Sequence, residues 1–426
     1  MDFHLTKEQL LVRKMYRDFA ENEVKPLAAE IDEEERFPME TVEKMAKLGM
    51  MGIYFPKEYG GAGADVLSYA MCVEELAKVC GTTAVIVSAH TSLCAAPIFE
   101  NGTEEQKMKY LPDLCSGKKI GAFGLTEPGA GTDAQGQQTT AVLDESGENY
   151  ILNGSKCFIT NGNVADTFVV IAVTGKTVDK RGRSMKEISA FIVEKDDKGF
   201  SQGKHEKKMG IRGSSTCDLI FEDCVIPKDR MLGKKGEGFK IAMKTLDGGR
   251  IGIASQALGL GEGAVEEAIK YTKERVQFGK RISQFQNTQF QLADMHTRTQ
   301  AAQYLIGDGQ LLGSLVVTGV GHLYDNVRIG GFFQRALERF HQVVGQAADE
   351  ADRIHQNNLQ AAGQGQLAGG GVQRGEQHVR LKDLLAAQGV QQAGLAHVGV
   401  AHQCHHGHIV FLSGAAGLTP ALLHLF

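Results

Sequence analysis

The sequence predicts an α+β chain in which helices come first, an antiparallel β domain follows, and helices return. Apolar residues recur with the helical period before residue 118, and this period returns from Gly238. Between them, short runs rich in Val, Ile, Phe and Thr alternate with turn residues. The 426 residues allow roughly two or three domains. We expect an N-terminal helical domain at 1–117, a middle antiparallel β barrel at 118–230, an incomplete C-terminal helical domain at 231–306 and an atypical tail at 307–426.

Composition excludes several classes of function. The formal net charge is -5 and basic residues do not cluster, so we expect neither nucleic-acid nor membrane binding. The 8 cysteines form no Cys-x-x-Cys pair and are typical of thiols in a reducing compartment. The N-terminus has no secretory pattern, so we expect a cytoplasmic protein. The apolar stretch Ile409–Phe426 is interrupted by Gly, Pro and His, which argues against a membrane span.

The first helical region begins at a capping box formed by Thr6 and Gln9, followed by an apolar stripe of Leu11, Met15 and Phe19. Further helical patterns and one short strand are expected before residue 118. The helices are expected after Pro38 and at Val66–Val79, Ser88–Phe99 and Glu104–Leu114, and the strand at Gly52–Phe55.

The β region and the second helical region differ in period. The runs IGAFGL, NYILNG, KCFIT, TFVVIAV, EISAFIV and CDLIFEDCVI are the predicted strands. Two long helices are then expected at Phe239–Lys273 and Ile282–Ile306, with Gly279 closing the first of them.

The strongest motif is a strand that leaves the sheet through a turn rich in proline and glycine. It presents two threonine hydroxyls and a row of backbone N–H groups, which suits an anion or a carbonyl. A purely structural turn is the alternative. The motif consists of Phe123, Gly124, Leu125, Thr126, Glu127, Pro128, Gly129, Ala130, Gly131, Thr132 and Asp133.

A second motif, Lys156–Gly162, places Phe158 and Thr160 on one face of a strand, with Ile159 between them. A flat ring beside a hydroxyl suits the edge of a flavin, and a structural strand and turn is again the alternative.

The third and fourth motifs lie in the second helical region. Leu246–Arg250 contains two glycines that cost about 1 kcal/mol each relative to alanine in a helix, so a ligand or a partner helix should approach closely there. Arg250 is placed to pair with a carboxylate or to clamp a ligand. Arg275 and Gln286 stand on either side of the joint at Gly279.

In this order and spacing, the four motifs resemble the acyl-CoA dehydrogenases, most closely the short-chain, butyryl-CoA type, over residues 1 to about 306. The resemblance implies helical, β and helical domains, bound FAD, an acyl-CoA substrate and a homotetramer. It also implies that electrons pass to an electron-transfer flavoprotein. No Rossmann site is needed, because Gly259-x-Gly261-x-Gly263 lies in a helical pattern without a preceding strand.

The resemblance also implies a role for each motif. Phe123–Thr132 would line the flavin, and Thr132 would also face the thioester. Phe158, Ile159 and Thr160 would cover the isoalloxazine ring. The CoA portion would contact Asp247, Gly248, Gly249 and Arg250, and the FAD of a neighbouring subunit would contact Arg275 and Gln286.

The family's reaction needs a glutamate that removes the α proton while the β hydrogen leaves as hydride to the flavin. The usual Tyr-Glu-Gly-Thr-like motif is absent: Arg353–Gly375 holds no acidic residue, and the surroundings of Glu376 do not fit. Some relatives carry the base just before the arginine of the third motif, where this chain has Gly249. A His-Gly-Gly-x-Gly-like flavin segment is also absent. No catalytic base is therefore assigned.

Composition changes after Ile306, where ten of the 14 histidines lie and Lys382 is the only lysine. Two interpretations stay open: an inactive homologue that binds acyl-CoA and flavin, or the product of a disrupted reading frame. The abrupt change favours the second. His402, Cys404, His405, His406 and His408 are metal-ligand types, but in so irregular a segment we expect adventitious binding and no metal cofactor.

Overall fold

The computed structural model describes residues 5–178, 182 and 184–317. Its first part is helical and is interrupted by two π turns, η1 (Ala20–Val24) and η3 (Ala89–Ala95), and one 3-10 turn, η2 (Lys57–Tyr59). The α-helices are α1 (Lys7–Phe19), α2 (Lys25–Glu33), α3 (Met39–Lys47), α4 (Val66–Ala77), α5 (Gly81–Ser88), α6 (Ala96–Asn101) and α7 (Glu104–Cys115).

The predicted start of α1 is confirmed. The backbone N–H of Gln9 donates to Thr6 Oγ1 at 3.1 Å, and the N–H of Thr6 donates to Gln9 Oε1 at 3.0 Å. The strand expected at Gly52–Phe55 is wrong. Its carbonyls accept hydrogen bonds from the N–H groups of the loop 62–64, but the backbone turns there and does not extend into a ladder.

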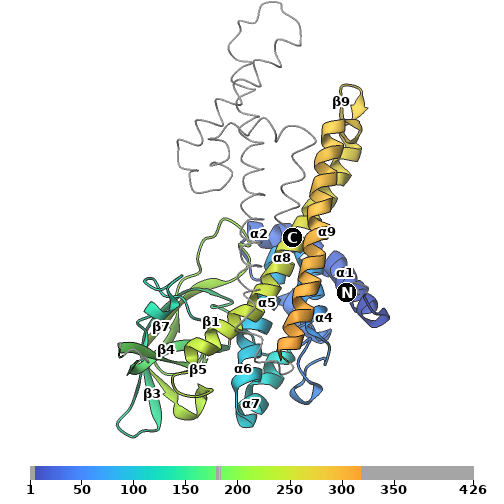
Figure 1. Ribbon diagram of the computed structural model, residues 1–426. Helices are drawn as coiled ribbons and strands as arrows, with labels where there is room; N and C mark the ends of the chain where they lie inside the picture. The colour runs from blue at the N-terminus through green and yellow to red at the C-terminus, as the bar shows by residue number, and fades with distance from the viewer. Residues whose placement is uncertain (1–4, 179–181, 183, 318–426) are drawn as a thin grey trace, which may run out of the picture. The chain divides into compact units, whose positions relative to one another are not determined.

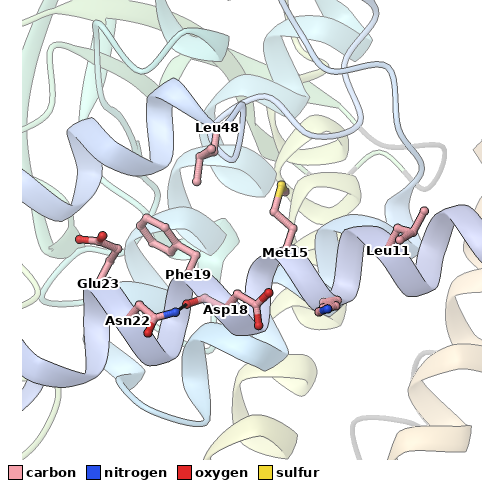
Figure 2. A pocket seen from close by; sticks show the side chains of 8 residues that line it. Leu11, Met15, Asp18, Phe19, Asn22, Glu23 and Leu48 are labelled. Carbon is pink, nitrogen blue, oxygen red and sulfur yellow. Dashed lines mark hydrogen bonds between the residues drawn. The ribbon is translucent and has the colours of Figure 1, made fainter.

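The apolar stripe of α1 does not face the core along its length. Phe19 is buried, whereas Leu11 is 68% exposed. Figure 2 shows that Leu11, Met15 and Phe19 line a surface hollow together with Leu48, with Phe19 as its most buried member. The remaining residues around this hollow are polar or charged: Lys14, Asp18, Asn22 and Glu23.

The stretch Gly81–Asn101, which runs through α5, η3 and α6, is long and apolar enough to cross a membrane. In the protein 89% of its most apolar window is buried, which is the environment of a core helix. It begins earlier than the sequence pattern predicted.

The middle part is one 8-stranded sheet in the order β6-β7-β3-β2-β4-β5-β8, with β1 paired to β4. Its pairs are mostly antiparallel, but β4 pairs in parallel with both β1 and β2. The long strands were predicted, whereas the short β2, β6 and β8 were not. The strands are β1 (Gly121–Gly124), β2 (Thr140–Leu143), β3 (Asn149–Thr160), β4 (Thr167–Val178), β5 (Ser184–Glu194), β6 (Phe200–Gln202), β7 (Thr216–Pro227) and β8 (Met231–Leu232).

Two long helices follow, α8 (Gly238–Glu274) and α9 (Gln286–Val317), and they pack side by side (Figure 1). A small hairpin of β9 (Val276–Gln277) and β10 (Lys280–Arg281) joins them. Gly279 does not close a helix as expected. It lies at the tip of this hairpin, where Phe278 and Gly279 have φ of 52° and 73°, as a tight hairpin turn requires.

Glycines on one face of α8 explain how that helix packs. A Cβ at Gly259 or Gly263 would lie 2.2 Å from a backbone carbonyl oxygen at the end of α4. A Cβ at Gly249 would lie 2.7 Å from the Leu93 side chain, whereas Gly248 has no such neighbour within 4 Å in the described part of the chain. Close approach of a partner helix, one of the two expected reasons for glycine, is therefore confirmed for this face.

Candidate functional site

The first motif forms a loop directly after β1. The N–H of Glu127 donates to the Ala130 carbonyl at 3.2 Å and the N–H of Ala130 donates back at 2.9 Å, which closes a tight turn. A Cβ on Gly129 or Gly131 would meet no neighbour within 4 Å among the described residues. Thr132 is exposed. The loop therefore offers open backbone and a hydroxyl to a ligand, while Phe123, Gly124 and Leu125 are buried.

The second motif contains a β-bulge. Lys156 pairs with Leu219 and Ile159 with Cys217, so β3 has one more residue than β7 between these pairs. Phe158 occupies the bulge with a φ of 60° and is 68% exposed. A positive φ is a rare and strained conformation for an aromatic residue, and such strain is concentrated at functional sites. Ile159 points into the core, which leaves only its backbone for a ligand.

Hydrogen bonds bring these two motifs together. The backbone N–H of Cys157 donates to the Thr126 carbonyl at 2.9 Å. The ammonium of Lys156 donates to the Leu125 carbonyl at 3.2 Å and to Glu127 Oε1 at 2.7 Å. The loop therefore lies next to the bulge that carries Phe158, and we call the exposed parts of the loop and the bulge the joined surface.

The Lys156–Glu127 pair is buried and ionised near neutral pH. Burial lowers the pKa of Lys156 to about 8, although the Glu127 carboxylate opposes this shift. Burial would raise the pKa of Glu127, but hydrogen bonds from Lys156 and from the Gln138 N–H more than offset it, so this pKa lies below its ordinary value. Lys156 begins the second motif, but the sequence analysis assigned it no role. A lysine within an apolar strand is the signal that could have identified it.

The third motif lies on α8, whose first residue packs against Ser189 of β5. Asp247 and Arg250 form an ion pair one helical turn apart, and both side chains are nearly half exposed. Burial raises the pKa of Asp247, although Arg250 opposes this effect. Gly249 has no side chain and lies on the face of α8 that packs against Leu93.

The fourth motif lies far from the loop within one chain. Arg275 and Gln286 are exposed and stand in the chain on either side of the β9–β10 hairpin. Figure 1 shows this hairpin at the far end of α8 and α9 from the sheet. The 37 residues of α8 give a helix about 55 Å long, and Arg275 follows its C-terminal end. The structure therefore joins the first two motifs and leaves the fourth remote from them.

Several predicted features lie outside the described residues. These are the segments searched for the family's glutamate, Arg353–Gly375 and Glu376, the apolar stretch Ile409–Phe426 and the histidine cluster His402–His408. Within the described residues, no group of three or more His, Cys, Asp or Glu side chains could hold a metal ion.

Comparison with known protein families gives three consecutive matches. Residues 6–118 match the acyl-CoA dehydrogenase N-terminal domain, 122–224 the acyl-CoA dehydrogenase middle domain and 236–308 the acyl-CoA dehydrogenase C-terminal domain. The fold class predicted from the sequence, with helical, β and helical parts in this order, is confirmed by these matches.

Individual proteins resemble the chain over the same part. The short-chain specific acyl-CoA dehydrogenase of Clostridium acetobutylicum is 64% identical over 306 residues, which cover 72% of this chain and 79% of the relative. The structure of butyryl-CoA dehydrogenase from Megasphaera elsdenii superimposes with a TM-score of 0.68 at 50% identity, covering 72% of this chain and 79% of the other. A chain in a structure of the electron transferring flavoprotein of Acidaminococcus fermentans gives a TM-score of 0.69 at 55% identity, covering 74% and 80%.

Proposed function

Because this chain belongs to the acyl-CoA dehydrogenase family, we propose that it is an FAD-dependent oxidoreductase that forms a Cα=Cβ double bond in a short-chain acyl-CoA. The reaction is of the butyryl-CoA to crotonyl-CoA type, and the electrons pass to an electron-transfer flavoprotein. We place the reaction in the cytoplasm. The observation that carries the proposal is the joined surface of the loop and the bulge, on which Phe158 is held exposed in a strained conformation.

The residues of this surface fit a flavin. A flat aromatic ring, three threonine hydroxyls and open backbone suit a planar heterocycle with polar edges. In the proposal, Thr126, Thr132, Phe158 and Thr160 contact the flavin with side chains, and the buried members of Phe123–Thr132 and Ile159 contribute backbone only. When bound, FAD supplies the acceptor for the hydride from the substrate's Cβ.

The substrate residues are assigned by their chemistry. Thr132 is an exposed hydroxyl on the loop and faces the thioester in this proposal. Asp247, Gly248 and Arg250 contact the CoA portion, whose phosphates suit an arginine guanidinium, whereas Gly249 faces Leu93 inside the protein. These residues bind and orient the substrate. Gly249, which has no side chain, supplies no carboxylate to remove the α proton.

We assign Arg275 and Gln286 to a site completed by a second copy of the chain. Both are exposed, and α8 separates them from the loop of their own chain, so they suit the FAD of a neighbouring subunit in a homo-oligomer. The fully exposed ring of Phe278 at the hairpin tip also suits an intersubunit contact.

The test is product formation. The flavin-loaded full chain is incubated with butyryl-CoA and an electron-transfer flavoprotein, and crotonyl-CoA is measured by chromatography. The proposal expects crotonyl-CoA, and expects Arg250→Gln to raise KM for butyryl-CoA more than it lowers kcat. A protein that holds FAD and binds butyryl-CoA without forming crotonyl-CoA would contradict dehydrogenation and support an inactive binding protein.

A further inference from the structure

The ammonium of Lys156 is completely buried at the foot of the joined surface. Its three N–H donors have three acceptors: the Leu125 carbonyl at 3.2 Å, Glu127 Oε1 at 2.7 Å and Gln137 Oε1 at 3.0 Å. We call these four residues, Lys156, Leu125, Glu127 and Gln137, the lysine clamp. Every donor of the ammonium is therefore used within the chain.

Glu127 extends the lysine clamp to the end of the loop. Its Oε1 also accepts the backbone N–H of Thr139 at 3.0 Å, and its Oε2 accepts the N–H of Gln138 at 2.6 Å. The lysine clamp therefore holds the loop where it leaves β1 and again where it enters β2. Between these points the loop is also held by Lys186 of β5, whose ammonium donates to the Gly136 carbonyl at 2.9 Å and to the Gln137 carbonyl at 2.6 Å.

The same lysine is directly followed in the chain by the bulge. The N–H of Cys157 donates to the Thr126 carbonyl at 2.9 Å, and Phe158 comes next. The Lys156 side chain and the neighbouring backbone thus tie the loop to the residues next to Phe158.

We propose that Lys156 is a positioning residue for flavin binding, which acts by holding the loop 125–139 against the bulge that carries Phe158. The inference rests on the proposed function, because it assumes that this surface receives FAD. Lys156 does not touch the ligand. It acts through Leu125, Glu127 and Gln137.

Energetic considerations separate this role from a purely structural one. A buried ion pair is weak support for stability, since its desolvation cost is comparable with its attraction. Removing Lys156 alone would leave the Glu127 carboxylate buried without a counter-charge, which destabilises the folded state. Removing both charges avoids that penalty, so the double variant Glu127→Gln with Lys156→Met separates positioning from folding.

A matched control uses the same two substitutions at an ion pair elsewhere in the β domain. Lys228 and Glu148 pair at 2.8 Å, and both side chains are at least half exposed. This pair joins the start of β3 to the end of β7 and does not contact the loop. The control variant is Glu148→Gln with Lys228→Met.

The experiment measures FAD binding by flavin fluorescence titration of the full-length apoprotein, together with the unfolding midpoint and the visible circular dichroism of bound flavin. We expect the clamp double variant to bind FAD at least about tenfold more weakly, and with an altered dichroism spectrum. The control variant should bind FAD as the wild type does. Should the double variant fail to fold, Gln137→Met, which removes one neutral acceptor, is expected to weaken FAD binding by about threefold or more.

A folded clamp variant with wild-type FAD affinity and dichroism would overturn the inference and leave the proposed function standing. If the double variant does not fold, a Gln137→Met variant that binds FAD with wild-type affinity would overturn the inference in the same way. A wild-type protein that cannot be loaded with FAD would overturn the proposed function and the inference together.

Discussion

At the scale of single residues, Phe158 stores backbone strain. A φ of 60° costs a non-glycine residue about 1–3 kcal/mol, and here the ring remains largely exposed. The sequence indicated Phe158 as a ligand residue from its alternation with Thr160, and the strain supports that assignment. The pairing of Lys156 with Glu127 was not predictable, because the two residues meet only when the loop folds back onto β3.

Substitution at Phe158 separates strain from ligand contact. Phe158→Gly should raise the apoprotein's free energy of unfolding by about 1 kcal/mol, because glycine adopts a positive φ without strain. Phe158→Ala should not, because it keeps the strain. Both variants should weaken FAD binding, since both lack the ring. Urea unfolding and FAD titration measure these effects, and unchanged FAD affinity in both variants would exclude the ring from the site.

His90 is a neutral ring that binds the first residue of β1. Its Nδ1 accepts the Gly121 N–H at 2.9 Å, and its Nε2 lies 3.1 Å from the Leu114 carbonyl, to which it donates. Complete burial lowers the pKa of His90 to about 4, whereas the unfolded chain protonates near its ordinary value of about 6.5. The stability from this group is therefore present above pH of about 6.5 and is lost as the pH falls towards about 4.

This linkage predicts a pH dependence. Between pH of about 7.5 and 5, His90 should remove ~2 kcal/mol from the free energy of unfolding. His90→Gln retains a donor and an acceptor but does not titrate, so its unfolding free energy should fall less over that interval. Chemical denaturation at the two pH values measures the difference. Equal pH dependence in both proteins would show that His90 is not the titrating group.

At the scale of elements, periodicity predicted the long elements well, and local exceptions were missed. Capping boxes at Thr6 and Thr103 begin α1 and α7, because both ends of each box are local in sequence. The strand expected at Gly52–Phe55 failed, and β2, β6 and β8 were missed, because a short strand depends on its partners in the sheet. The bulge at Phe158 depends on register with β7, which is non-local.

Helix α8 offers a direct test of its glycine face. Gly259→Ala should destabilise the protein by about 1–3 kcal/mol, because its Cβ would lie 2.2 Å from the Glu74 carbonyl oxygen. Gly261→Ala, two residues away, meets only the Thr299 methyl at 3.6 Å and should stabilise by about 0.5–1 kcal/mol through helix propensity. Thermal unfolding of the two variants compares them. The same sign for both would refute close helix packing as the reason for Gly259.

At the scale of the whole molecule, family membership follows from three consecutive domain matches that end at residue 308. The order of helical and β parts was predictable, because composition and period change along the chain. The contact between the loop and the bulge was not predictable, because it depends on hydrogen bonds of Lys156 and Cys157 to residues distant in the sequence. The large distance between Arg275 and that surface was also not predictable from the motifs, because it follows from the length of α8 in the folded chain.

Complementation between subunits tests whether the site is shared. Arg275→Ala leaves the loop intact, and Phe158→Ala leaves the hairpin intact. Each variant purified alone should bind FAD weakly. When the two variants are co-expressed with different tags and the hybrid is purified, sites that combine both intact parts should regain wild-type FAD affinity. Hybrids without such sites would place Arg275 on the FAD of its own chain or outside the site.

Dehydrogenation of a short-chain acyl-CoA by bound FAD is tested most directly by anaerobic titration of the flavin-loaded full chain with butyryl-CoA. The long-wavelength absorption band of the flavin reports its oxidation state. We predict that this band bleaches as butyryl-CoA is added and that crotonyl-CoA appears in the same amount. A flavin band that stays oxidised while butyryl-CoA binds would contradict dehydrogenation by this chain.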